Sequence, residues 1–178
     1  FAKSHKVIAI DLPGHGMSEN IGYVHQMDEM AECVQSIIHA LGILRVMLIG
    51  HSMGGYVALA FADLFPDQVQ KLVLYQSTAK DDTPEKKADR NRAMKLIKTN
   101  HQSFIRSSIP MLFRPKNRAI FREQINELKA EALKTSRQGV IAALTGMHDR
   151  SNREIILKFA PYPVDIIASD YDPRIPLE

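Results

Sequence analysis

The sequence VMLIGHSMGG at residues 46–55 carries the strongest structural signal in the chain. Its first four residues are apolar and predict a short buried strand. The apolar run at 56–62 predicts a helix, so that a sharp turn with Ser52 at its apex joins strand and helix. Gly50 and Gly54 are expected to remove steric clashes around this turn, and Gly55 to let the helix approach the sheet closely.

A G-x-S-x-G pattern between a strand and a helix is typical of a nucleophile elbow. Such a turn holds the Ser52 hydroxyl exposed above the end of the strand, at the positive end of the helix dipole. Serine attacks a carbonyl only when a base takes its proton, and the base needs a third group to orient it. The alternative interpretation is a serine in a tight turn that has no chemical role.

Further strands and helices alternate on both sides of this turn. The β-branched residues at 5–10 predict a strand, and apolar residues at helical spacing predict a helix over 27–41. Strands are also predicted at 71–75 and 163–168. This alternation predicts an α/β fold with a mostly parallel sheet and helices on both faces.

Residues 80–148 contain no convincing strand and predict an all-helical insertion. Thr83 and Pro84 are expected to begin its first helix as the N-cap and the first helical residue. Pro110 and Pro115 are expected to divide the helices. One amphipathic stripe is predicted to pack inside the insertion, formed by Phe121, Ile125, Leu128 and Ala132.

Composition limits the classes of partner. The 178 residues suit one domain, or one domain with an insertion, and no apolar run reaches the roughly 18 residues of a membrane span. The single cysteine excludes an internal disulfide and fits the reducing cytoplasm. No histidine or cysteine cluster has metal-ligand spacing, so no metal is expected. The leading hypothesis given below implies no organic cofactor either.

The formal net charge is +3, but residues 80–137 hold fifteen basic and seven acidic side chains. One interpretation is a solvated basic face. The other is a surface that attracts an anionic substrate or an acidic carrier protein. The basic side chains lack interleaved aromatic residues and a recognisable binding motif, which argues against nucleic acid. The sequence gives no indication of oligomeric state.

GHSMGG at 50–55 and DLPGHGMS at 11–18 together resemble the α/β-hydrolase family. The resemblance covers nearly the whole chain and is strongest over 6–80 and 163–176. It implies a partial α/β-hydrolase fold in three parts. Residues 1–80 are the first part of the core with the nucleophile elbow, 81–148 a helical cap, and 149–178 the second part of the core with the acid loop.

The resemblance also implies roles for individual residues. Asp172 best matches the acid loop after the last strand, although Ser169 stands where the family usually has glycine. Asp170 is the second candidate for the acid. The backbone N–H of Met53 supplies one oxyanion donor. His15 is interpreted as ordering its loop rather than acting as a base.

Two parts of the family's catalytic machinery are missing from the sequence. The family's catalytic histidine follows the acid, but no histidine follows Asp172. The second oxyanion donor and a central strand lie upstream of Phe1 in the family. We therefore interpret the chain as an internal segment of a longer hydrolase and expect residues 1–178 alone to have negligible activity.

These observations lead to one leading hypothesis and several alternatives. The leading hypothesis is a serine hydrolase that cleaves an ester or related acyl bond of a small molecule through a Ser-His-Asp triad and an acyl-enzyme. A non-catalytic binding protein, or inactive fragment, of the same fold is the first alternative. An acyltransferase, a thioesterase and a carbon–carbon hydrolase or lyase remain further alternatives, because they use the same residue types.

Overall fold

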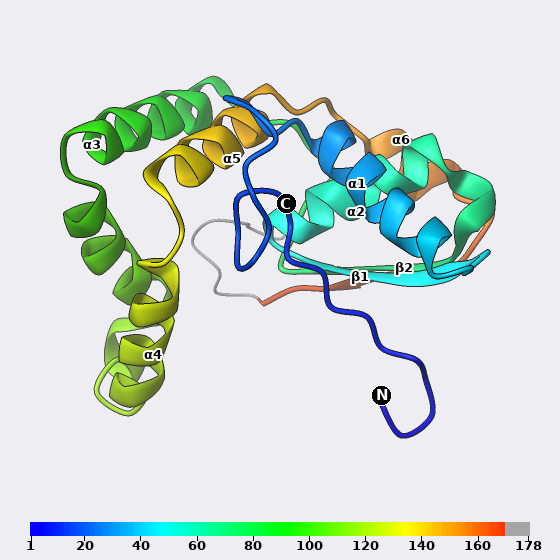
Figure 1. Ribbon diagram of the computed structural model, residues 1–178, viewed down its shortest axis with the longest axis horizontal. Coiled ribbons are helices and arrows are strands. Elements are labelled where there is room, and N and C mark those ends of the chain that lie inside the picture. The colour runs from blue at the N-terminus through cyan, green and yellow to red at the C-terminus, as the bar shows by residue number, and fades with distance from the viewer. Residues whose placement is uncertain (170–178) are drawn as a thin grey trace.

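A three-stranded parallel sheet forms the centre of the computed structural model, which describes residues 1–169. The strands are β1 (Val46–His51), β2 (Val69–Tyr75) and β3 (Val164–Ile167), in the spatial order β1-β2-β3. Both neighbouring pairs run parallel, so each connection crosses over the sheet (Figure 1). The predicted α/β class with a parallel sheet is confirmed.

Helix α2 (Met53–Leu64) fills the space between the sheet and α1 (Met27–Ala40). Residues 55–62 of α2 are all buried, and Phe61 is completely inaccessible. A helix that is apolar on every side is stable only when it is covered on every side. The buried side chains of Leu72 and Leu74 on β2 belong to the same core as α2. The short helix α6 (Glu154–Phe159) adds half-buried side chains to this core.

The helical segment, residues 84–149, extends to one side of the sheet (Figure 1). It consists of α3 (Pro84–Ser108), two short 3₁₀ helices (Ile109–Leu112 and Pro115–Asn117), α4 (Arg122–Ala132) and α5 (Arg137–Asp149). The predicted start of α3 is confirmed, because Thr83 Oγ1 accepts a hydrogen bond from the backbone N–H of Lys86 at 3.3 Å. Asn100, at φ −150° and ψ 83°, divides α3 into two parts.

The predicted strand at 5–10 is wrong. These residues have no regular secondary structure, and Val7 is 58% exposed. A strand must pair its backbone N–H and C=O groups with a neighbour. In the described part of the chain β1 pairs only with β2, so no strand lies along its other edge to receive residues 5–10.

The predicted apolar stripe on α4 is only partly buried. Ile125 is 4% exposed, but Phe121 and Leu128 are about 40% exposed. The stripe therefore contributes one core side chain to the helical segment. Two of its four members face solvent instead.

One face of the sheet is open to solvent within residues 1–169, and both edge strands, β1 and β3, lack an outer strand partner there. Met47, Ile49 and Tyr75 alternate with the core residues along β1 and β2, and each is at least 46% exposed.

None of the helices within residues 1–169 has both the length and the apolar character needed to cross a membrane.

His25 is a completely buried residue where the helical segment meets the core. Its backbone N–H donates to the carbonyl of Ala142 on α5 at 3.1 Å. Gly146 passes so close that a Cβ there would lie 1.7 Å from the His25 carbonyl oxygen. Burial lowers the pKa of the His25 imidazole, and the charge of His15 lowers it further, while Glu29 acts in the opposite direction.

Acidification should therefore destabilise the protein through His25. Its pKa is lower in the folded chain than in the unfolded chain, where it is about 6.5. As the pH falls, the unfolded state gains the proton first. The contribution of neutral His25 to the free energy of unfolding is therefore fully present above about pH 6.5 and decreases as the pH falls from there through the pKa of the folded state. Thermal unfolding followed by circular dichroism between pH 7.5 and pH 5 tests this. The variant His25→Asn should reduce the pH dependence, and the exposed His39→Asn serves as the surface control. An unchanged pH dependence in His25→Asn would contradict the assignment.

Candidate active site

Ser52 lies between β1 and α2 in a strained backbone conformation. Its φ of 51° and ψ of −118° lie in a region that non-glycine residues rarely adopt. Three hydrogen bonds hold the peptide groups around it. The Ser52 N–H donates to the carbonyl of Tyr75 at 3.1 Å, and the Ser52 carbonyl accepts from Gly55 N–H and Ser77 Oγ, both at 2.9 Å. Such strain persists only where the surroundings fix the backbone, as these hydrogen bonds do here. Ser52 itself is exposed to solvent.

The elbow depends on close approach at two glycines. A Cβ on Gly50 would lie 2.5 Å from the Gly54 carbonyl oxygen, and a Cβ on Gly55 would lie 2.2 Å from Ser77 Oγ. Helix α2 therefore rests directly against β1 and the end of β2. Gly54 differs from the expectation: within the described chain, a Cβ there would meet no atom within 4 Å. Gly54 is the second residue of α2, and the space where its Cβ would lie is free.

Met53 is the first residue of α2 and is half-buried. The first N–H groups of a helix have no carbonyl acceptor within the helix, and the helix dipole adds positive potential there. The Met53 N–H is thus a donor at the helix end where Ser52 is the N-cap. This arrangement suits stabilisation of a negative oxygen next to the serine.

The predicted acid, Asp172, and the second candidate, Asp170, lie outside the described residues. The structure nevertheless fixes where the chain leaves β3. Tyr75 pairs with Ile167, and the backbone N–H of Gln76 donates to the Ile167 carbonyl at 2.8 Å. Because the three strands are parallel, their carboxyl-terminal ends lie at the same end of the sheet. The end of β3 is therefore on the same side as Ser52, two strand spacings or about 10 Å away. The role of Asp172 stays a prediction.

Within residues 1–169, no histidine forms a hydrogen bond with Ser52. The His15 ring nitrogen Nδ1 lies 3.1 Å from the Pro13 carbonyl oxygen, which agrees with a role in ordering its loop. The His51 ring contacts the Tyr75 ring, with 5.1 Å between centroids. His148 Nδ1 lies 2.5 Å from the Asp149 carboxylate at the end of α5.

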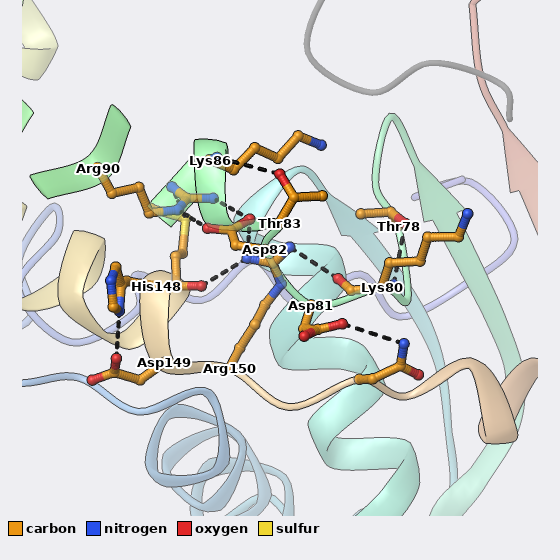
Figure 2. A network of polar contacts seen from close by, with 12 residues as sticks. Thr78, Lys80, Asp81, Asp82, Thr83, Lys86, Arg90, His148, Asp149 and Arg150 are labelled. Carbon is orange, nitrogen blue, oxygen red and sulfur yellow. Dashed lines mark hydrogen bonds and ion pairs between the residues drawn. The ribbon is translucent and has the colours of Figure 1, made fainter. Parts of the chain in front are cut away.

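A buried ionic network is the largest feature that sequence reasoning missed (Figure 2). The Asp82 carboxylate binds the guanidinium groups of Arg90 and Arg150, and the Asp82 side chain is 1% exposed. Burial alone would raise the pKa of Asp82. Hydrogen bonds from both arginines, together with their positive charges, outweigh burial and lower this pKa overall. The sequence signal was weak, because these residues lie in a charged stretch that resembles a solvated face.

A cavity of about 390 Å³ lies where the loop before α1 meets α3 and α5. Two cations line it, Lys98 and Arg137, together with Tyr23, Gln138 and Ile141. Neither cation forms an ion pair with any described carboxylate; Arg137 Nη1 donates instead to the Lys98 carbonyl at 3.4 Å. The cavity therefore presents uncompensated positive charge.

Comparison with known proteins gives one family and several relatives. The sequence profile of a family described as "alpha/beta hydrolase fold" matches residues 1–178. Among solved structures, a thermophilic esterase from Thermogutta terrifontis, described as malate bound, is 31% identical with a TM-score of 0.85. That comparison covers 93% of this chain and 61% of the esterase. An enol-lactonase from Burkholderia xenovorans is similar in fold, at 18% identity and a TM-score of 0.78, over 88% of this chain and 59% of the lactonase.

Curated relatives match a shorter region. A 2-hydroxy-6-oxononadienedioate/2-hydroxy-6-oxononatrienedioate hydrolase from Paraburkholderia phymatum is 41% identical over 71 residues, which are 39% of this chain and 25% of that protein. A dihydrolipoyllysine-residue acetyltransferase component of the acetoin cleaving system from Pseudomonas putida is 43% identical over 76 residues, 43% of this chain and 20% of that protein. The matches thus span a quarter or less of these curated relatives.

The three elbow glycines should respond differently to replacement by alanine. Gly50→Ala and Gly55→Ala force backbone or Ser77 to move, which should cost about 1–3 kcal/mol of stability each. Gly54→Ala is the matched control, because its Cβ has space and alanine favours a helix by up to about 1 kcal/mol. Chemical denaturation of the three variants measures these differences. Equal losses at all three positions would contradict the packing described.

Proposed function

The chain belongs to the α/β-hydrolase fold family, and on this premise we propose that it is the nucleophile-bearing part of a serine hydrolase that cleaves an ester or related acyl bond. The observation that carries the proposal is the Ser52 backbone, held at a positive φ by three hydrogen bonds at the start of α2. A fixed backbone with an exposed hydroxyl is what a nucleophile requires, since it restricts the side chain before substrate arrives.

In the proposed reaction Ser52 Oγ attacks the substrate carbonyl carbon and its proton passes to a histidine from outside residues 1–178. The Met53 N–H donates to the oxygen that becomes negative. Asp172 orients the histidine and stabilises its positive charge. The histidine then gives the proton to the leaving oxygen, and the acyl group stays on Ser52. Water, deprotonated by the same histidine, releases the acid and restores the serine.

We further propose that residues 81–148 cap the site, between core parts formed by residues 1–80 and 149–178, and that the acyl substrate is anionic. The support is the basic composition of 80–137 and the cavity lined by Lys98 and Arg137, neither of which forms an ion pair with a carboxylate of residues 1–169. The names of two relatives agree with this chemistry. The esterase structure is described as malate bound, and the hydrolase is named for a dioate, a dicarboxylic anion.

An acyltransferase is the second candidate, because one relative is named as an acetyltransferase component. The residues and the acyl-enzyme would be the same, with an alcohol or thiol replacing water as the acceptor. Analysis of products in the presence of glycerol or a free thiol separates the two reactions. A non-catalytic binding protein would leave Ser52 unmodified by reagents that acylate or phosphonylate active serines.

Ser52 should be the only residue labelled by a fluorophosphonate probe in the complete protein. Ser52→Ala should abolish labelling and lower kcat for p-nitrophenyl acetate by at least about a thousandfold, because triad members act as a unit. The exposed helical residue Ser36 gives the matched control, and Ser36→Ala should label and react as the parent protein does. Labelling that persists in Ser52→Ala would contradict the proposal.

Lys98 and Arg137 should favour substrates with a free carboxylate. The double variant Lys98→Met/Arg137→Met is expected to raise KM for a dicarboxylic monoester about tenfold or more, and to leave KM for the corresponding neutral diester within about twofold. Lys95 is an exposed residue on α3, the helix that carries Lys98, and Lys95→Met is the control for a general loss of positive charge. Equal KM changes for both esters would contradict an anion subsite.

A further inference from the structure

The helical segment is joined to the core at two chain crossings, and a pair of buried opposite charges connects them. Asp82 precedes the N-cap of α3, where the chain enters the segment, and Arg150 follows the last residue of α5, where the chain returns. Arg150 Nη1 lies 2.7 Å from Asp82 Oδ1, and the two side chains are 3% and 1% exposed. Figure 2 shows both groups meeting between the start of α3 and the end of α5.

Arg150 binds both crossings at once. Its Nη2 donates to the carbonyl of Lys80 at 2.9 Å, and its Nη1 donates to the carbonyl of Met147 at 2.7 Å. Arg90, on the second turn of α3, donates from Nε to Asp82 Oδ2 and from Nη2 to Asp82 Oδ1, the latter at 3.3 Å. Its Nη1 donates to Met147 Sδ at 3.4 Å. A guanidinium group suits this position because its planar set of donors reaches several acceptors together.

The Arg150 guanidinium also contacts α2, the helix that begins directly after the proposed nucleophile Ser52. Its central carbon lies 4.0 Å from the centre of the Tyr56 ring. Tyr56 is 7% exposed and stands on the first turn of α2, four residues after Ser52. A cation over an aromatic face is attracted by the ring, more strongly where water is excluded. Contacts therefore run without a break from the helical segment through Arg150 to the first turn of α2.

We propose that Arg150, held by Asp82, is a positioning residue that fixes the helical segment relative to Ser52 and so sets the space available to the acyl group. This rests on the proposed function for its kinetic consequence only. Replacing Asp82 leaves the buried Arg150 guanidinium without its counter-charge, and replacing Arg150 removes the group that bridges the two crossings, although Arg90 still pairs with Asp82. Either loss favours local release of α3 and α5 from the core. The exposed ion pair between Arg92 and Asp89, also on α3, bridges no such junction.

Hydrogen–deuterium exchange on the complete protein tests the structural part without any assay of activity. In Arg150→Met and Asp82→Asn, exchange in peptides from α3 and α5 should rise at least about tenfold, while peptides from α1 stay within about twofold. The double variant Asp82→Asn/Arg150→Met should exchange no faster than the single variants, because the two residues act as one pair. Arg92→Met is the matched control and should exchange as the parent protein does. Unchanged exchange in the single variants, or additive effects in the double variant, would overturn the proposal.

Kinetics test the positioning role. With a long-chain p-nitrophenyl ester, Arg150→Met should raise KM about tenfold, while kcat for p-nitrophenyl acetate and fluorophosphonate labelling of Ser52 should change less than about threefold. A merely structural role would lower the active fraction and reduce turnover of both esters equally, with KM unchanged, and that result would overturn the proposal. If the parent protein neither labels nor reacts, the proposed function fails, and the exchange experiment still decides the coupling.

Two milder variants keep the test decisive if Arg150→Met does not fold. Arg150→Lys retains the charge opposite Asp82 but cannot reach both carbonyls, so exchange in α3 and α5 should rise by an intermediate amount. Tyr56→Leu removes only the ring under the guanidinium and should raise KM for the long ester with little change in exchange. Parent-like behaviour of both variants would overturn the proposal.

Discussion

The close packing of α2 against β1 and the end of β2 is the constraint on which the rest of the structure depends. At Gly50 and Gly55 there is no room for a side chain, and the Ser77 hydroxyl occupies the remaining space while binding the Ser52 carbonyl. This contact fixes the turn at Ser52. Tyr56, on the first turn of the same helix, lies under the Arg150 guanidinium, so the helix fixed by this packing also contacts the junction with the helical segment.

Features that depend on neighbouring residues in the chain were predictable. The α1 helix, the elbow strand and the Thr83 cap appear where periodicity and capping chemistry placed them, because these signals act over a few residues. The segment at 5–10 has the composition of a strand, but within residues 1–169 it has no neighbouring strand to pair with. Strand propensity describes how well residues fit into a sheet, so a sequence pattern alone does not predict whether a neighbouring strand is present.

The candidate site divides in the same way. Ser52 and Met53 follow from a local motif, and the structure places them at the N-terminus of α2 as expected. The motif overstated Gly54, since pattern matching does not distinguish a glycine under contact from one with free space. Asp82 and Arg150 are far apart in the sequence, and their charges look like those of solvated residues until the fold buries them together. The role of Asp172 stays a prediction.

The sharing of one buried carboxylate by Arg90 and Arg150 has a consequence for how this sequence can diverge. The group carries a net positive charge, and most single replacements leave an unmatched charge or an unfilled space in the interior. A substitution at one of the three positions therefore requires a compensating substitution at another, so the three residues are expected to covary. Descendants that abandon the ion pair are expected to have exchanged several members for apolar residues, with the helical segment and the core evolving in step at their junction.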